Sequence, residues 1–138
     1  MKFCEVKKVS KEKFGRIVTN GVELLSHEYK TVLSLTEYGF DIELVRPSSV
    51  PYSKNPDLLM GGTAWEMKSP VGNGKYTIQR LFHKAGRQAS NVVIDLRRIN
   101  IAEEKALDEV KKRFEYSRTI RRILILTKSG ELLDIKKK

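Results

Sequence analysis

PDLLMGGTAWEMKSP, residues 56–70, is the stretch that decides which fold we expect for this chain. Its glycine pair at 61–62 suits the positive φ angles of a two-residue hairpin turn. A turn at that pair places Asp57 opposite Glu66. Opposed side chains on an antiparallel pair share a face and stand roughly 5 Å apart, and Lys68, two residues further on, points to that same face. The hairpin is therefore predicted to gather two carboxylates and one ammonium group.

Two opposed carboxylates repel each other, so this arrangement needs a compensating charge. A hard divalent cation such as Mg²⁺ or Mn²⁺ provides it, because these ions prefer carboxylate oxygens. The alternative is an exposed hairpin in which Lys68 forms a local salt bridge. Charged residues make up 32% of the chain, so Glu-X-Lys alone says little. Asp57 in register across the turn is the stronger indication of a metal site.

A helix is predicted over residues 21–38, with Asn20 as its cap, Glu23 completing a capping box and Gly39 ending it. At helical spacing, Glu28 falls within the apolar arc. That arc consists of Leu24, Leu25, Tyr29, Val32, Leu33 and Leu35. An ionised glutamate facing a core is costly unless it is paired or binds a metal. Glu28 is thus a candidate third carboxylate, the alternative being a glutamate that reaches water at the edge of the arc.

The rest of the chain predicts a mixed α/β domain with a central sheet and helices on its faces. Hydrophobic periodicity and turn residues give the following elements: a strand at 40–47, the hairpin above, a helix at 76–90, a buried strand at 91–96, a helix at 102–117 and a hairpin around 129–130. Residues 3–18 fit either a strand pair or a short helix. All 138 residues fit a single domain.

The charge balance favours a polyanionic partner. The chain has 27 basic and 17 acidic residues, a formal net charge of +10. This favours nucleic acid first and an anionic membrane surface second, while solubility alone is the third interpretation. No signal peptide or transmembrane segment is visible, so a cytoplasmic protein is expected. The single cysteine, Cys4, excludes an intramolecular disulfide and a cysteine-built zinc site.

Together these features resemble the PD-(D/E)XK nuclease superfamily, with Pro56-Asp57 and Glu66-X-Lys68 as the motif. The resemblance implies a restriction-endonuclease-like αβββαβ core over about residues 21–96, with 97–138 extending the sheet. More closely, PDLLMGGTAWEMKSP together with KAGRQASNVVIDL is similar to the C-terminal tRNase domains of contact-dependent growth inhibition toxins.

The resemblance implies metal-dependent hydrolysis of phosphodiester bonds. Asp57 and Glu66 would hold a divalent metal, Mg²⁺ or Mn²⁺ with Zn²⁺ as an alternative, and Glu28 would be a further ligand, directly or through water. Such a metal would activate a water molecule and neutralise developing charge. Lys68 would position the water or stabilise negative charge.

The helix after the motif is expected to contribute to substrate binding. In related sites this helix supplies a further polar residue, and here Lys84 and Gln88 lie beside its apolar stripe, with Arg87 adjacent. A solvated flank is the alternative for these side chains. We expect His83 to be exposed and Trp65 to pack in the core.

Three functions remain open from the sequence. The first is an endonuclease on RNA, with tRNA as a candidate substrate. The second is a DNA endonuclease of the restriction or resolvase type, and the third is a non-catalytic basic module that binds nucleic acid. The resemblance to toxin domains also implies a cognate immunity protein, whether the chain is excised from a larger toxin or free-standing. No membrane partner is expected.

Overall fold

The computed structural model describes residues 4–49 and 55–137. Within these ranges the chain forms eight strands and three helices. In chain order they are β1 (Cys4–Val9), β2 (Ile17–Val18), α1 (Ser26–Glu37), β3 (Ile42–Leu44), β4 (Leu58–Met60), β5 (Thr63–Lys68), α2 (Thr77–Ala85), β6 (Asn91–Asp95), α3 (Glu103–Tyr116), β7 (Arg122–Leu126) and β8 (Leu132–Lys137). No helix in the described ranges is long and apolar enough to cross a membrane.

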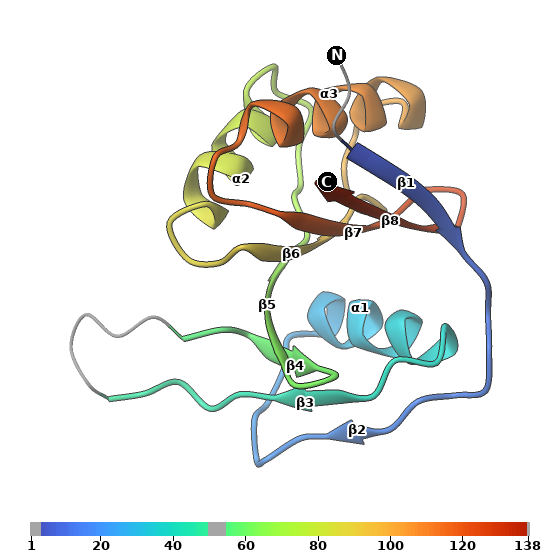
Figure 1. The fold of residues 1–138 in the computed structure, drawn as a ribbon, viewed down its shortest axis with the longest axis vertical. Helices are drawn as coiled ribbons and strands as arrows, with labels where there is room; N and C mark the ends of the chain where they lie inside the picture. The colour runs from blue at the N-terminus through green and yellow to red at the C-terminus, as the bar shows by residue number, and fades with distance from the viewer. Residues whose placement is uncertain (1–3, 50–54, 138) are drawn as a thin grey trace.

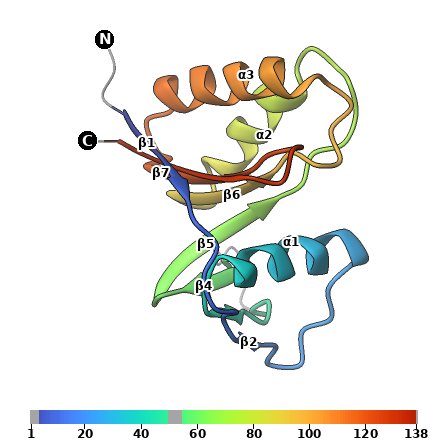
Figure 2. The same cartoon turned by 90° about the vertical axis from the view of Figure 1, so that its right-hand side faces the viewer.

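The strands form one mixed sheet in the order β1-β8-β7-β6-β5-β4-β3-β2. It bends strongly at β5, so that α1 lies between its two halves, while α2 and α3 lie side by side on the outer face (Figures 1 and 2). The mixed α/β class predicted from the sequence is confirmed. Strands β7 and β8 follow β6 in the sheet, so the segment after residue 96 extends it as expected.

Two apolar clusters pack against the sheet, one on each face. One joins α2 and α3 to the outer face, where Val92, Ile94 and Ile123 are fully buried. The other lies under α1 and includes Trp65 and Met67 of β5. Because side chains alternate along a strand, Glu66 and Lys68 point to the α2 side. The prediction that Trp65 packs in the core is confirmed, since only 2% of its surface is exposed.

The register of the β4–β5 hairpin is the predicted one. Leu58 pairs with Trp65, Leu59 with Ala64 and Met60 with Thr63. Gly61 and Gly62 have φ angles of 58° and 79°, which glycine adopts at little cost. The turn chemistry thus fixes which residues of the two strands face each other.

For the N-terminal segment, the sequence left a strand pair and a short helix as alternatives. The segment forms two strands, but they are not paired with each other. β1 pairs with β8 at one edge of the sheet, and β2 pairs with β3 at the other. The partner of each strand comes from a distant part of the sequence, which is why local pattern could not place them.

The start of α1 differs from the prediction. Asn20 and Gly21 have φ angles of 50° and 74°, so the chain turns there and the helix begins only at Ser26. The Asn20 amide donates to Glu43 Oε2 (3.2 Å) and to the Leu44 carbonyl (2.9 Å), tying the turn to β3. The predicted Asn20–Glu23 capping box is therefore wrong.

The apolar arc assigned to α1 is also partly wrong. Leu25, Tyr29 and Leu33 are 64%, 50% and 37% exposed. The buried side is formed by Thr31, Val32, Leu35 and Thr36. Two threonines occupy the packed face because each hydroxyl bonds to a carbonyl oxygen of a preceding residue in the helix, His27 or Leu33. The prediction counted only apolar residues as buried, so it missed threonines whose hydroxyl groups form hydrogen bonds within the helix.

Candidate active site

The site begins with the carboxylate of Asp57, just before β4. Its backbone N–H donates to the Trp65 carbonyl (3.0 Å), which continues the hairpin one residue beyond the strand. Its side-chain Oδ2 accepts a hydrogen bond from the Met67 N–H (2.7 Å). The Asp57 carboxylate is therefore held against β5, next to Glu66.

Glu66 is the buried member of the pair. Its residue surface is 5% exposed, and Oε2 makes no hydrogen bond with the described residues. Burial is the largest cause that raises its pKa, to about 8. The neighbouring Asp57 adds to the rise, since it attracts a protonated Glu66 and repels an ionised one. Glu66 is thus mostly protonated at neutral pH in the absence of a cation.

Lys68 completes the predicted trio. Its Nζ lies 3.8 Å from Glu66 Oε1, and its side chain is 22% exposed. This ammonium lowers the pKa of Glu66, but less than burial and Asp57 raise it. Asp57, Glu66 and Lys68 are therefore brought together as the register required, and Lys68 does not cancel the rise in the pKa of Glu66.

Glu28 has a different role in this structure. Its Oε1 accepts a hydrogen bond from the Leu25 N–H (2.9 Å), which caps the first turn of α1. Helix α1 packs on the face of β5 opposite to Glu66. Within 4–49 and 55–137, no hydrogen bond or ion pair joins Glu28 to Asp57 or Glu66. Glu28 is half-buried and lies in the first turn of α1.

The predicted substrate-binding residues lie at the end of α2. Lys84, Arg87 and Gln88 are all exposed. Arg87 and Gln88 border a cavity of about 480 Å³ that also touches Pro56 and Ala64. Pro56 precedes Asp57, and Ala64 is two residues before Glu66 on the same face of β5. This cavity therefore borders residues that are close in sequence to both members of the carboxylate pair.

His83 is exposed, as predicted. Its Nε2 lies 3.1 Å from Arg87 Nη2, so the two side chains occupy one surface of α2. Among the described residues, His83 has no bond to Asp57 or Glu66. It is therefore an exposed residue of α2 that is not bonded to the carboxylate pair.

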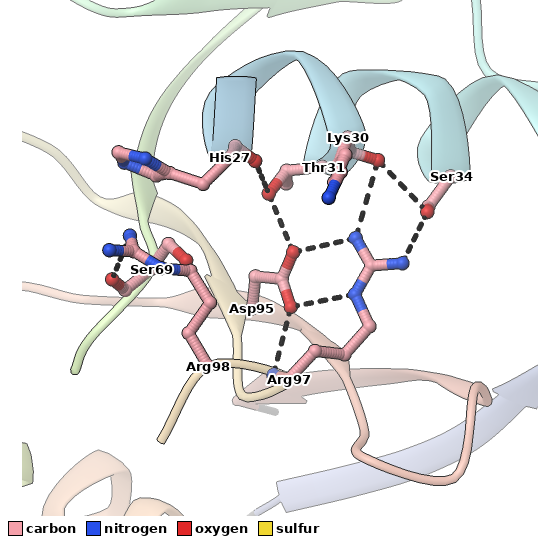
Figure 3. A network of polar contacts seen from close by, with 8 residues as sticks. All are labelled: His27, Lys30, Thr31, Ser34, Ser69, Asp95, Arg97 and Arg98. Carbon is pink, nitrogen blue, oxygen red and sulfur yellow. Dashed lines mark hydrogen bonds and ion pairs between the residues drawn. The ribbon is translucent and has the colours of Figure 1, made fainter. Parts of the chain in front are cut away.

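A polar network on the α1 face was not predicted (Figure 3). Asp95, 2% exposed, ends β6 and accepts a 2.6 Å hydrogen bond from Thr31 of α1. Arg97 contacts both Asp95 oxygens, at 3.0 and 2.7 Å, and reaches Ser34 at 2.7 Å. Burial alone would raise the pKa of Asp95, but hydrogen bonds from Arg97 and Thr31 outweigh it and lower the pKa. The network fastens α1 to the sheet.

One sequence signal could have revealed this network. Asp95 ends an otherwise apolar buried strand and is followed by Arg97 and Arg98. A carboxylate at such a position needs a partner, and the nearest cation in the sequence supplies it. Arg97 therefore forms an ion pair with Asp95, and Arg122 forms one with Asp134 (2.8 Å). These two arginines are therefore less available to bind phosphates than unpaired basic residues would be.

The carboxylate pair fits a divalent cation by its chemistry. Glu66 Oε2 is buried without a hydrogen-bond partner, and both residues offer hard oxygen ligands. No group of three His, Cys, Asp or Glu side chains suited to a metal occurs in the described residues. Since Mg²⁺ is commonly held by one or two carboxylates with retained waters, two protein carboxylates are enough for a weak or substrate-completed site.

Comparison with known proteins identifies the family. Residues 54–132, which contain the hairpin, α2, α3 and β7, match the contact-dependent growth inhibition CdiA C-terminal domain family. This match covers more than half of the chain, and the chain belongs to that family of toxin domains. A search of curated proteins gave no match.

A solved structure has a similar fold. It is a CdiA-CT/CdiI toxin and immunity complex from Burkholderia pseudomallei, with a TM-score of 0.68 and 18% identity. The alignment covers 88% of this chain and 99% of that one. Because the alignment covers 88% of this chain, the similarity of fold extends beyond residues 54–132.

Proposed function

We propose that this CdiA C-terminal domain is a metal-dependent nuclease of the PD-(D/E)XK type. The observation that carries the proposal is the pairing of Asp57 with a buried Glu66 whose Oε2 has no hydrogen-bond partner, beside Lys68. The order α1-β3-β4-β5-α2-β6 corresponds to the αβββαβ core of that superfamily and supports the same proposal.

Asp57 and Glu66 are the residues that would hold the metal, with Mg²⁺ or Mn²⁺ preferred for an all-oxygen site and Zn²⁺ less suited. When bound, such an ion lowers the pKa of a coordinated water and offsets charge on the scissile phosphate. Glu66 must lose its proton for this role. The Met67 N–H keeps the Asp57 carboxylate oriented, which limits the reorganisation needed on binding.

Lys68 is the proposed charge-stabilising and water-orienting residue. Its partly exposed ammonium lies at the rim of the buried pair, where it can contact both a phosphate oxygen and an attacking water. Glu28 is proposed as a contributor through water. Its present bond to the Leu25 N–H would have to be given up for direct ligation.

Nucleic acid is the proposed substrate, with RNA, and tRNA in particular, ahead of DNA. The net charge of +10 supports a polyanion, and Arg87 and Gln88 line a cavity that also touches Pro56, the residue before Asp57. Basic contacts of this kind give affinity without sequence readout. The preference for tRNA rests on the sequence resemblance described above.

We also propose a cognate immunity protein as the partner. The similar structure is a toxin bound to its immunity protein, which supports this proposal. The positive charge of this chain favours an acidic partner surface, because complementary charge speeds association and selects partners.

The test is a cleavage assay with tRNA, unstructured single-stranded RNA and duplex DNA. Each is incubated with Mg²⁺, Mn²⁺, Zn²⁺ or EDTA. The proposal predicts cleavage of RNA with Mg²⁺ or Mn²⁺ and none in EDTA. Cleavage of duplex DNA alone would reassign the substrate. No metal-dependent cleavage of any substrate, together with no Mn²⁺ binding that Asp57→Ala abolishes, would leave a binding module as the function.

A further inference from the structure

A second cavity lies between α3 and the segment that leads into α2. Its volume is about 500 Å³. One wall is residues 73–76, and the other is a side of α3 that presents Lys105, Glu109 and Lys112. None of Asp57, Glu66 or Lys68 lines it, so it is separate from the candidate active site.

The lining of the cavity carries a net positive charge, although Glu104 and Asp108 lie beside Lys105 and Lys112 on an adjoining surface of α3. Four cations and one carboxylate line it. The carboxylate, Glu109, is bound by the fourth cation, Arg113, at 2.8 Å. In the part of the chain that the structure describes, Lys75, Lys105 and Lys112 form no ion pair. Three ammonium groups around one hollow favour a multiply charged anion such as a phosphate.

An aromatic ring and an apolar floor stand beside this charge. The Tyr76 side chain is 53% exposed, whereas Ile78 and Ala106 are 2% and 0% exposed. Lys75 Nζ lies 5.7 Å from the centre of the Tyr76 ring. A solvent-facing aromatic ring beside an apolar wall suits a planar heterocycle, because a nucleobase can stack on such a ring.

The loop wall is anchored to the rest of the fold. Gly72 forms an isolated bridge with Ile99, and its carbonyl accepts a hydrogen bond from the Asn100 N–H (2.8 Å). Lys128 Nζ in turn donates to the Ile99 carbonyl (2.8 Å). These bonds tie the residue just before the loop wall to the segment that leads into α3, which reduces the entropic cost of ordering that wall on binding.

We propose that this cavity binds a phosphorylated nucleoside unit, with its phosphate on Lys105 and Lys112 and its base against Tyr76. Charge without an aromatic surface would suit any polyanion, and the ring without charge would suit any apolar ligand. Their combination in one preformed cavity selects a nucleotide. The unit is either a free nucleotide or a nucleotide within an RNA chain. This inference does not depend on the nuclease activity proposed above.

Calorimetry on the whole chain in EDTA tests the proposal, because EDTA prevents any metal-dependent cleavage. The probes are 5′-AMP, adenosine, inorganic phosphate and a short 5′-phosphorylated RNA. We expect AMP to bind more tightly than adenosine or phosphate. Lys105→Ala with Lys112→Ala should weaken binding about tenfold, and Tyr76→Ala by a similar factor, while Tyr76→Phe binds as the wild type does.

Lys111→Ala is the matched control. Lys111 is the exposed neighbour of Lys112 on α3, but it does not line the cavity. Binding of RNA but not of AMP, with the same dependence on Lys112 and Tyr76, supports the proposal and identifies the RNA chain as the source. Equal effects of Lys111→Ala and Lys112→Ala would overturn it. So would equal affinity for AMP and phosphate, or no saturable binding of AMP or RNA.

Discussion

Asp57 and Glu66 lie side by side with unequal hydrogen bonding. Asp57 Oδ2 is held by the Met67 N–H at 2.7 Å, whereas Glu66 Oε2 is buried and has no partner among the described residues. Burial disfavours the ionised form of a carboxyl group, and the pKa of the unpartnered Glu66 is raised accordingly. A bound cation would favour the ionised form of Glu66 instead.

The stability of the metal-free protein should fall as pH rises. The pKa of Glu66 is raised from 4.5 to about 8 in the folded state, so the folded state binds more protons between these values. Its contribution is fully present below about pH 4.5 and is lost as pH rises through about 8, at no more than about 1.4 kcal/mol per unit. Urea denaturation in EDTA at pH 5 and pH 8 measures this loss.

Glu66→Gln is the control for that measurement, since glutamine cannot ionise. The variant should show a smaller loss of unfolding free energy between pH 5 and pH 8, and it should be more stable than the wild type at pH 8. Identical pH dependence of the two proteins would mean that Glu66 ionises normally in the folded state.

Metal binding should release a proton. Glu66 is mostly protonated at pH 7, and a carboxyl group must be ionised to bind a divalent cation. Titration of Mn²⁺ in two buffers of different ionisation enthalpy should give different observed binding enthalpies. The difference should correspond to the uptake of about one proton by the buffer for each ion bound. Affinity should also rise with pH up to about 8. The idea fails if Glu66-dependent binding shows the same enthalpy in both buffers.

Removal of the Asp95 carboxylate should loosen α1 from the sheet. Asp95 is 2% exposed and binds both Thr31 and Arg97. We expect Asp95→Ala to lower the free energy of unfolding by about 3–5 kcal/mol, as for other buried pairs. Glu109→Ala, which breaks the pair with Arg113 at the surface of α3, should cost about 0.5 kcal/mol. Similar losses in the two variants would contradict this role for Asp95.

The affinity for RNA should fall steeply as the salt concentration rises. It is measured with Glu66→Gln, which we expect to bind RNA without cleaving it. Contacts from basic side chains to phosphates release counterions, so the logarithm of affinity falls linearly with the logarithm of salt concentration. Arg87→Ala should reduce the size of this slope by about one. Lys7→Ala should leave it unchanged, because Lys7 is on β1, four strands from β5 in the sheet. Fluorescence anisotropy measures both slopes, and equal effects of the two variants would exclude the α2 end as the RNA contact.

The hairpin was predictable because its information is local. A glycine pair fixes the turn, the turn fixes the register, and the register places Asp57 opposite Glu66 with Lys68 on the same face. The main helices and the C-terminal hairpin were predictable for similar reasons, apart from their ends. The predicted helix at 76–90 is observed as Thr77–Ala85, and the predicted strand at 40–47 as Ile42–Leu44.

The remaining features depend on tertiary contacts. Asn20 could cap a helix or turn the chain, and its bond to the Leu44 carbonyl decides for the turn. Thr31 was not part of the predicted buried arc of α1, and its partner, Asp95, comes from a distant strand. The position of Glu28 relative to the hairpin depends on which face of the sheet α1 covers, which helical periodicity cannot specify.

The most direct test of the nuclease proposal is the initial rate of RNA cleavage with saturating Mn²⁺ for the wild type and Lys68→Ala. Lys68 is partly exposed, so its removal should leave the fold intact, as thermal unfolding of both proteins will show. We expect the rate to fall at least about 100-fold, the usual loss when one charge-stabilising group is removed from an active site. Equal rates for the two proteins would contradict the catalytic role of the Asp57–Glu66–Lys68 site.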